Sequence, residues 1–485
     1  MTRSRWGRRW PRSGGQIVHS KRLTPSARPT ECKPVAGPAI EAPDRVALVD
    51  SLDLDPSAHL DDLSAFIQAS PSPFHAAAEA AARLAEAGFT MAEESAPWPT
   101  ADGRYFVRRG GALVAWSTDG AADCRNGFTI VGAHTDSPNL RLRPRPEHKS
   151  AGMAQLGVEI YGGALLNSWL DRDLGLSGRV SVVDSDGSVS TRLFRYDQPL
   201  LRVPQLAIHL DRSITTDGLR LDPQRHLQPV WSSSPQTIST FRVWLAEQLD
   251  VRSESLAGWD LMTHDLTPPA RLGVDRSMFA SARLDNLLSC HAGLTALLAR
   301  NSDSPQVPVL CLFDHEEVGS QSSTGAASQL LPTILERIAT ASGLSRDEWF
   351  ASLASSMCIS ADGAHATHPN FPERHEPDHL VFLDGGPVLK WNADARYGTD
   401  APGAAHVVSL AQRLNIPLQT FVSRNDMPCG STIGPVTAAR LGVTTVDIGV
   451  AQLSMHSARE LTGVLDPARF AMLLNAFYST PVQAN

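Results

Sequence analysis

Two adjacent glutamates, Glu316 and Glu317, follow a short apolar segment (308–313) and precede the turn residues Gly319 and Ser320. Side-by-side carboxylates repel each other, so a partly buried pair is costly unless a proton or a cation lies nearby. A divalent metal ion removes that cost, because one carboxylate binds the cation and the other handles a proton. An isolated Glu-Glu pair is usually a solvated surface step. Here the apolar strand before it and the turn after it indicate a βα loop, where functional residues gather.

Further side chains that can bind metals are spread along the chain, mostly where an apolar segment ends. His134 and Asp136 follow one such segment, in FTIVGAHTDSPN, and Asp285 opens a helical pattern in ARLDNLLS. Asp362 follows a third apolar segment, and His456 lies just beyond a fourth. Open α/β sheets form their sites outside the carboxyl ends of the strands, so this distribution favours such a sheet.

The inventory of side chains matches a site for two zinc ions. Zinc takes imidazole nitrogens and carboxylate oxygens, and a catalytic ion keeps one position open for water. Two neighbouring ions need about one histidine and one carboxylate each, together with a carboxylate that bridges them. We expect these ligands to be His134, His456, Glu317, Asp362 and, as the bridge, Asp285. Glu316 is then free to act as the general base.

Asp136 is expected to support the first histidine of this site. It lies two residues after His134 on an extended segment, so both side chains point to the same side of the chain. Its carboxylate can accept the second imidazole N–H and fix the tautomer.

Each of these motifs also has an ordinary structural explanation. A lone histidine at a strand end is commonly a hydrogen-bonded polar group, and the Asp285–Asn286 step suits a helix N-cap. Asp362 precedes a glycine, as in many turns. Ser457 and Glu460 have the spacing of a capping box. The order of the motifs along the chain, each at an expected loop, favours the metal site.

The same motifs resemble the M18 family of metallo-aminopeptidases, the aspartyl aminopeptidase group. Eight collinear segments carry the resemblance from about residue 60 onward: ASPSPFH (69–75), GAHTDSPNLRLRP (132–144), RLDN (283–286), HEEVGS (315–320), ADGAHATHPN (361–370), GGPVLKWNADARYGTD (385–400), RNDMPCGSTIGP (424–435) and QLSMHSARE (452–460). The family pattern has proline before the last segment, where this chain has Ala451. That difference concerns a loop and no ligand.

The resemblance implies the same ligands and base, with two Zn²⁺ per chain, for which Co²⁺ or Mn²⁺ can substitute. It implies peptide substrates whose free amino end lies against the metals. Lys390 matches a position in the pocket for the first side chain, where an ammonium favours an acidic residue. The alternative for Lys390 is a surface lysine. His209 matches a histidine that reaches a neighbouring subunit's active site, and its alternative is an ordinary core or surface residue.

Length and charge limit the number of domains and the kinds of partner that we expect for this protein. The 485 residues suggest two domains or one large one, and no apolar run is long enough to cross a membrane. The first 30 residues contain eight Lys and Arg and no acidic residue, whereas the rest of the chain has 35 basic against 51 acidic residues. An acidic body argues against nucleic acid as a partner.

The six cysteines indicate a cytoplasmic protein. They lie far apart, form no CxxC pair and stand mostly in apolar contexts, at positions 32, 124, 290, 311, 358 and 429. Reduced, buried thiols are the simplest explanation. Arg8-Arg9 is not followed by an apolar segment, so we expect no targeting peptide.

The pattern of elements predicts an α/β fold with an inserted β-rich domain, and the resemblance implies that this fold is a three-layer sandwich of the zinc-exopeptidase type. Helical periodicity marks residues 58–70, 72–89, 284–300, 326–342 and 467–479, and neighbouring strands are expected at 112–118 and 127–136. Strand-like segments and turns dominate from 146 to 258. We therefore predict a disordered basic extension (1–54), a split catalytic domain (55–145 and 259–485) and an inserted domain (146–258) that is placed to close over the site. The resemblance to the M18 family implies that the inserted domain also makes dimer contacts.

The resulting hypothesis is a dinuclear zinc aminopeptidase that removes acidic or neutral N-terminal residues. In the resembled family such enzymes assemble through dimers into a tetrahedral dodecamer, so we expect a homo-oligomer. Alternatives are another dinuclear zinc hydrolase, such as a deacylase, an endopeptidase or a carboxypeptidase, and a noncatalytic assembly protein. Nucleic-acid binding through the arginine-rich first 30 residues is a weaker alternative.

Overall fold

The computed structural model describes residues 52–100, 102–234, 240–301 and 303–482. The expected basic extension (1–54) lies outside these ranges apart from residues 52–54, and so does the arginine-rich segment on which a nucleic-acid interaction would depend. None of the helices in the described ranges combines the length and the apolar character needed to cross a lipid bilayer.

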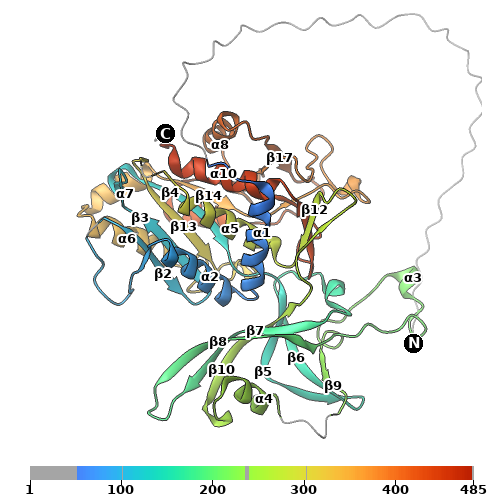
Figure 1. Ribbon diagram of the computed structural model, residues 1–485. Coiled ribbons are helices and arrows are strands. Elements are labelled where there is room, and N and C mark those ends of the chain that lie inside the picture. The colour runs from blue at the N-terminus through green and yellow to red at the C-terminus, as the bar shows by residue number, and fades with distance from the viewer. Residues whose placement is uncertain (1–51, 101, 235–239, 302, 483–485) are drawn as a thin grey trace, which may run out of the picture. The chain divides into compact units, whose positions relative to one another are not determined.

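A central sheet organises the molecule (Figure 1). Within the described ranges it has nine strands, in the order β1 (Thr90–Met91), β2 (Arg104–Arg109), β3 (Ala112–Ser117), β13 (Val307–Phe313), β4 (Phe128–His134), β14 (Met357–Ala361), β18 (Thr444–Gly449), β16 (Val388–Trp391) and β17 (Gln419–Val422). The four strands β13, β4, β14 and β18 run parallel to one another. Their carboxyl ends therefore meet at one edge of the sheet.

Helices cover both faces of this sheet and complete three layers (Figure 1). One apolar core joins the sheet to α1 (Pro56–Ala69), α2 (Pro73–Glu86), α5 (Leu284–Leu298), α8 (Ala401–Arg413) and α10 (Asp466–Ser479). The other joins it to α6 (Leu330–Ala341), α7 (Arg346–Ala354) and α9 (Ile433–Leu441). The expected three-layer α/β class is thereby confirmed.

Local sequence explains where the first helices begin. The side chain of Asp55 accepts a hydrogen bond from the backbone N–H of Ala58, and Ser72 caps α2 in the same way. A proline follows each cap, at the position where a missing N–H costs nothing. Both helices then turn apolar faces to the sheet, as their periodicity predicts.

A second sheet lies outside this three-layer body. In the described ranges its six strands are β8 (Val189–Leu201), β7 (Leu174–Val183), β10 (Leu256–Asp265), β5 (Asn139–Ser150), β6 (Met153–Tyr161) and β9 (Val230–Ser232). Helices α3 (Ile214–Asp217) and α4 (Phe241–Leu249) belong to the same part of the chain. The sheet thus runs from residue 139 to residue 265, whereas the inserted domain was expected at 146–258. The domain division itself stays a prediction.

A third, smaller sheet was not expected from the sequence. Its five described strands are β11 (Ala270–Leu272), β12 (Met278–Ser281), β20 (Glu460–Gly463), β19 (Ala451–Leu453) and β15 (Ala364–His365). Short 3₁₀ helices occur at Cys124–Asn126, Leu166–Trp169, Ser253–Ser255, Glu316–Val318 and Pro372–Arg374. The third sheet brings the chain after β18 back toward the start of α5, which matters for the site below.

Helix α5 is buried on nearly every side, and it approaches the central sheet closely through a glycine. A Cβ placed on Gly293 would lie 2.7 Å from Cδ1 of Leu310 in β13, so a larger residue would push the helix away. Leu310 itself is fully buried between the sheet and this helix.

Replacing Leu310 with alanine should destabilise the fold by about 2–5 kcal/mol, because the packed core cannot fill the cavity. Urea unfolding followed by circular dichroism measures this free energy. Val274→Ala is the control, since Val274 is fully exposed, and its effect should stay within about 0.5 kcal/mol. Equal effects of the two substitutions would contradict the described packing.

Candidate active site

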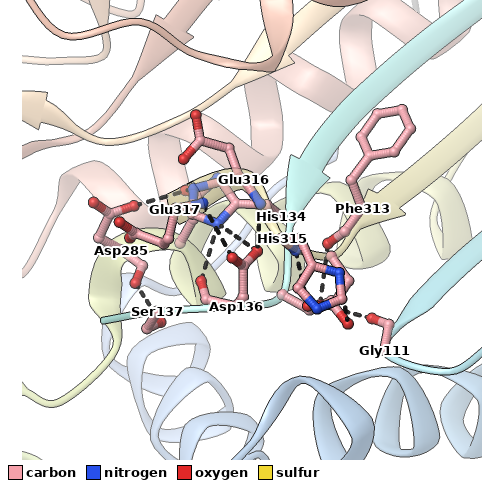
Figure 2. Close-up of polar contacts among 12 residues, drawn as sticks. Gly111, His134, Asp136, Ser137, Asp285, Phe313, His315, Glu316 and Glu317 are labelled. Carbon is pink, nitrogen blue, oxygen red and sulfur yellow. Dashed lines mark hydrogen bonds and ion pairs between the residues drawn. The ribbon is translucent and has the colours of Figure 1, made fainter. Parts of the chain in front are cut away.

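The predicted ligands meet at the carboxyl edge of the central sheet. Figure 2 shows three of them, His134, Asp285 and Glu317. His134 ends β4, Asp362 follows β14, and Glu317 lies in the turn after β13; these three strands are adjacent and parallel. Asp285 comes from the first turn of α5 and His456 from the turn after β19. Side chains separated by up to 322 residues in sequence therefore converge on one place.

The ligands form two groups that share Asp285. In the first group, Nε2 of His134 lies 3.4 Å from Oδ1 of Asp285 and 3.7 Å from Oδ1 of Asp362. In the second, Nε2 of His456 lies 3.3 Å from Oδ2 of Asp285 and 3.5 Å from Oε1 of Glu317. The two oxygens of Asp285 thus face different groups, which is the geometry of a bridging carboxylate.

Both imidazoles are oriented through their other ring nitrogen. Nδ1 of His134 lies 3.0 Å from the backbone oxygen of Asp136, and Nδ1 of His456 lies 3.2 Å from that of Gly163. A carbonyl accepts only an N–H, so each Nδ1 carries the proton in the neutral ring. The lone pair of each Nε2 then faces the carboxylates, as a metal ligand requires.

Asp136 holds the turn that bears the two glutamates (Figure 2). It is fully buried, and its two oxygens accept the backbone N–H groups of Glu316 and Glu317, each at 3.1 Å. The hydroxyl of Tyr161 donates to the same carboxylate at 2.6 Å. Burial raises the pKa of Asp136, but these donors and His134 outweigh it, and the pKa is lowered. Asp136 therefore stays ionised and fixes the turn.

The residues fit a pair of divalent cations. Oδ1 of Asp285 and Oε1 of Glu317 are buried and accept no hydrogen bond, which is costly for a carboxylate without a cation. Ligands about 2.0 Å from a tetrahedral zinc ion lie roughly 3.3 Å apart, and the measured nitrogen–oxygen separations are 3.3–3.7 Å. Imidazole and carboxylate donors are also the types that zinc prefers.

The pKa shifts of the clustered groups also indicate that the site needs a positive charge. Burial raises the pKa of Glu316 to about 8, and nearby Asp362 and Asp136 add to this against the opposing effect of His134. Burial and Asp285 raise the pKa of Glu317 well above its ordinary value. Burial lowers the pKa of His456, but Asp285 and Glu317 outweigh it and raise the value to about 10. Without a cation the cluster thus retains protons that metal binding would release.

The glutamate Glu460 supports the site in a way that the sequence analysis missed. It is buried, and its two oxygens accept the backbone N–H groups of Asp285, at 2.9 Å, and His456, at 2.7 Å. One carboxylate thereby fixes two ligands that are 171 positions apart. The capping-box alternative for Ser457 and Glu460 is wrong, because β20 rather than a helix begins at Glu460.

The start of α5 also differs from a simple N-cap. Asp285 has φ −83° and ψ 104°, outside the helical region, and its side chain faces the two histidines. The hydroxyl of Ser137 donates to its backbone oxygen at 2.6 Å, and Asn286 donates to the backbone oxygen of Ala361 at 2.8 Å. The RLDN motif therefore ties α5 to the ends of β4 and β14.

Of two further predicted residues, Lys390 adjoins the cluster, and His209 lies in an exposed loop. Lys390 in β16 is almost fully buried, and its Nζ donates to the backbone oxygens of Asp362 and Gly363, each at 3.1 Å. It therefore adjoins a predicted ligand and is not a surface lysine. His209 is exposed in the loop after β8, beside the exposed Ile208 and Leu210. Its proposed reach into another subunit stays a prediction.

A cavity of about 290 Å³ opens beside the cluster. Its lining includes none of the five predicted ligands, but it includes His365, Gln452 and Met455, which are close to Asp362 and His456 in sequence, together with Tyr397 and Phe421. An imidazole–carboxylate cluster at the carboxyl edge of a three-layer α/β fold, next to such a cavity, is the arrangement of a metal-dependent hydrolase.

Comparisons with known proteins identify the kind of hydrolase. The family model for the aminopeptidase I zinc metalloprotease (M18) matches residues 66–478. A probable M18 family aminopeptidase 2 from Streptomyces coelicolor is 53% identical over 423 residues, which cover 86% of this chain and 97% of that relative. A chain of the Ape4 and Nbr1 complex is 35% identical with a TM-score of 0.84, over 87% of this chain and 86% of that one.

A further solved structure, the mApe1 dodecamer of S. cerevisiae, is 27% identical with a TM-score of 0.75, over 87% of this chain and 96% of that one. The chain belongs to the M18 family of zinc metallo-aminopeptidases. The expected family, fold type and enzyme class are thereby confirmed, and family membership implies zinc as the metal.

Replacing Asp285 with asparagine should weaken metal binding in both groups, because one of its two oxygens faces each group. We expect fewer than two zinc ions per chain, and an affinity loss greater than the roughly 10–100-fold that outer partners of a metal site are worth. Plasma mass spectrometry and chelator competition measure both quantities. Asp347→Asn, at an exposed position, is the control. Unchanged zinc content in Asp285→Asn would contradict the bridging assignment.

Proposed function

We propose that this aminopeptidase uses two zinc ions, held by His134 with Asp362 and by His456 with Glu317, and bridged by Asp285. When bound, the ions supply positive charge that acidifies water and stabilises the oxyanion of the cleaved peptide. The single observation that supports this arrangement most strongly is the sharing of Asp285 between two ligand groups, one facing each of its oxygens.

Glu316 is proposed as the general base. It lies beside Glu317 in the same turn, and the described ligand groups do not include its carboxylate. Burial raises its pKa to about 8 in the absence of a cation, and positive charge nearby would lower that value toward neutrality. A base whose pKa lies near the working pH can take a proton from water and later give it to the leaving amine. Asp136 holds the backbone of this residue in place by accepting the N–H of Glu316.

The cavity beside the cluster is proposed to receive the first side chain of a peptide. Its lining combines apolar groups, such as Phe421 and Met455, with the basic Arg374 and Arg424 and the acidic Glu376. Lys390 is next to Asp362, and its Nζ lies 5.1 Å from the ring centre of Tyr397, a lining residue of this cavity. This mixture supports acidic or neutral N-terminal residues as substrates.

We also propose that the chain binds other copies of itself. The mApe1 relative named above is a dodecamer, and this chain exposes Leu206, Ile208 and Leu210 around His209 in the loop after β8. Apolar side chains gathered in an exposed loop favour a contact with another protein surface. A homo-oligomer in which His209 approaches a neighbouring active site is consistent with this exposure.

Replacing Glu316 with glutamine should leave zinc binding nearly unchanged and lower kcat by about 10²–10⁴, the usual contribution of a general base. The measurement is steady-state hydrolysis of aminoacyl amides together with the zinc content of the same preparation. Glu247→Gln, at an exposed position in α4, is the control. Near-normal turnover in Glu316→Gln would exclude the proposed base.

A peptide with a free α-amino group should be cleaved, whereas its N-acetylated counterpart should resist cleavage. An aminopeptidase needs the amine, but a deacylase, an endopeptidase or a carboxypeptidase does not. Mass spectrometry of the products of the matched pair separates these activities. Efficient cleavage of the blocked peptide would favour the other hydrolases, and two bound zinc ions without any cleavage would favour a noncatalytic assembly protein.

A further inference from the structure

The end of β6 lies beside the candidate active site because a strand pair returns the chain there. The chain leaves the site after Asp136, forms β5, turns, and comes back along β6 in the antiparallel direction. In the register of this pair Tyr161 faces Asn139, three residues beyond Asp136. The antiparallel pairing of β5 with β6 thus places residues 161–163 beside the candidate active site.

Tyr161 makes the first contact of this segment with the centre. Its hydroxyl donates to Oδ2 of Asp136 at 2.6 Å, and the same oxygen accepts the backbone N–H of Glu317. Tyr161 is buried, and the guanidinium of Arg141 stacks 3.6 Å from the centre of its ring. Since the ring is held on its face and the hydroxyl at its tip, Asp136 has a fixed partner from the second sheet.

Gly162 makes the second contact, directly against a predicted ligand. Its φ is +68°, and a Cβ placed on it would lie 3.0 Å from Cβ and 3.1 Å from Oε2 of Glu317. Both the backbone conformation and the limited space therefore favour glycine. The backbone of this residue forms one wall of the position that Glu317 occupies.

Gly163 makes the third contact, with the other end of the cluster. Its backbone oxygen accepts the Nδ1–H of His456 at 3.2 Å, and a Cβ on it would lie 3.1 Å from that nitrogen. The next turn continues the contact, because the N–H of Leu165 donates to the backbone oxygen of His456 at 3.0 Å. The orientation of this imidazole is thus set from the second sheet and not from the central one.

We infer that residues 161–163 form a positioning segment through which the second sheet sets the geometry of the metal centre and of the turn that carries the general base. The inference rests on the proposed function of that centre. Three consecutive residues touch Asp136, Glu317 and His456. A displacement of β6 would therefore move the predicted ligand His456 and also Asp136, which supports the turn of Glu316. Tyr161, Gly162 and Gly163 are positioning residues and do not contact the reacting atoms.

Tyr161→Phe tests the first contact, because it keeps the ring on Arg141 and removes only the hydroxyl. We expect kcat to fall about 10–100-fold, the usual cost of losing an outer partner of a metal site, with KM changed less than about threefold. Zinc content should stay at two per chain. In the cobalt-substituted protein the visible absorption bands should shift, since they report ligand geometry.

Gly163→Ala tests the third contact by pushing the His456 ring through a single methyl group. Because Gly163 has no positive φ, the substitution adds little backbone strain. Chelator competition should show that one of the two ions is held about 10–100-fold more weakly while the other is unchanged. This readout does not depend on the activity of the enzyme.

Matched controls come from the same sheet. Tyr196→Phe removes a hydroxyl from a ring that packs on Trp244, and Gly258→Ala adds a methyl group where no heavy atom lies within 4 Å. Both should match the parent protein in melting temperature, cobalt spectrum and turnover. If Tyr161→Phe and Gly163→Ala behave like these controls, residues 161–163 have no positioning role.

The outcomes also separate this inference from the proposed function. An unmodified protein that fails to bind two ions, or a fully active Glu316→Gln variant, would overturn the metal centre or its base. Two bound ions with unchanged kcat, spectrum and metal affinity in both test variants would overturn only the role of residues 161–163. Should Gly163→Ala lower the melting temperature strongly, Tyr161→Phe, which removes one oxygen atom, still decides the matter.

Discussion

The fold of this protein depends on bringing mutually repelling carboxylates together in a place from which water is largely excluded. Asp285 and Asp362 are buried, the side chain of Glu317 is almost fully enclosed, and Asp136 and Glu460 are buried behind them. In a low-dielectric interior such a set is unfavourable unless each charge has a partner. The structure meets this need in two ways. Backbone N–H groups stabilise the supporting carboxylates by donating hydrogen bonds to them, and the geometry of the ligands leaves room for divalent cations.

The supporting carboxylates act on the backbone more than on the ligands' side chains. Asp136 binds the N–H groups of Glu316 and Glu317, and Glu460 binds those of Asp285 and His456. A hydrogen bond to the backbone fixes the position of a residue's main chain. A second contact, such as that of Gly163 with the His456 ring, fixes the direction of its side chain. Since misplacement by about 1 Å can cost a factor of about 10² in rate, two-point support is what a catalytic site requires.

Much of the candidate site and of the fold could be predicted from the sequence, because side chains that can bind metals follow the apolar segments that form buried strands. The five ligand candidates stand after apolar segments or at a helix start, and the structure places them within two groups. The long helices α1, α2, α5 and α10 follow from their periodicity, with bounds close to those expected.

What could not be predicted concerns pairing between distant segments. Strands β3 and β4 follow each other in sequence, yet β13 lies between them, because pairing order depends on packing of the whole sheet. The third sheet consists of strands as short as two residues, too short to show a period. Glu460 looked like part of a helix cap, and only the tertiary structure brings its carboxylate to Asp285. For Tyr161, the Gly-Gly step after a strand was the available signal of a close backbone approach.

The long separation of the ligands in sequence has a consequence for biosynthesis. His134 emerges early during translation, but the centre closes only after β20 has been made, since Glu460 and His456 hold the second ligand group together. Contacts of such long range form late, after the loop between them has been ordered. A nascent chain therefore lacks the complete cluster until every described strand of the central sheet, and β20 after them, has been synthesised.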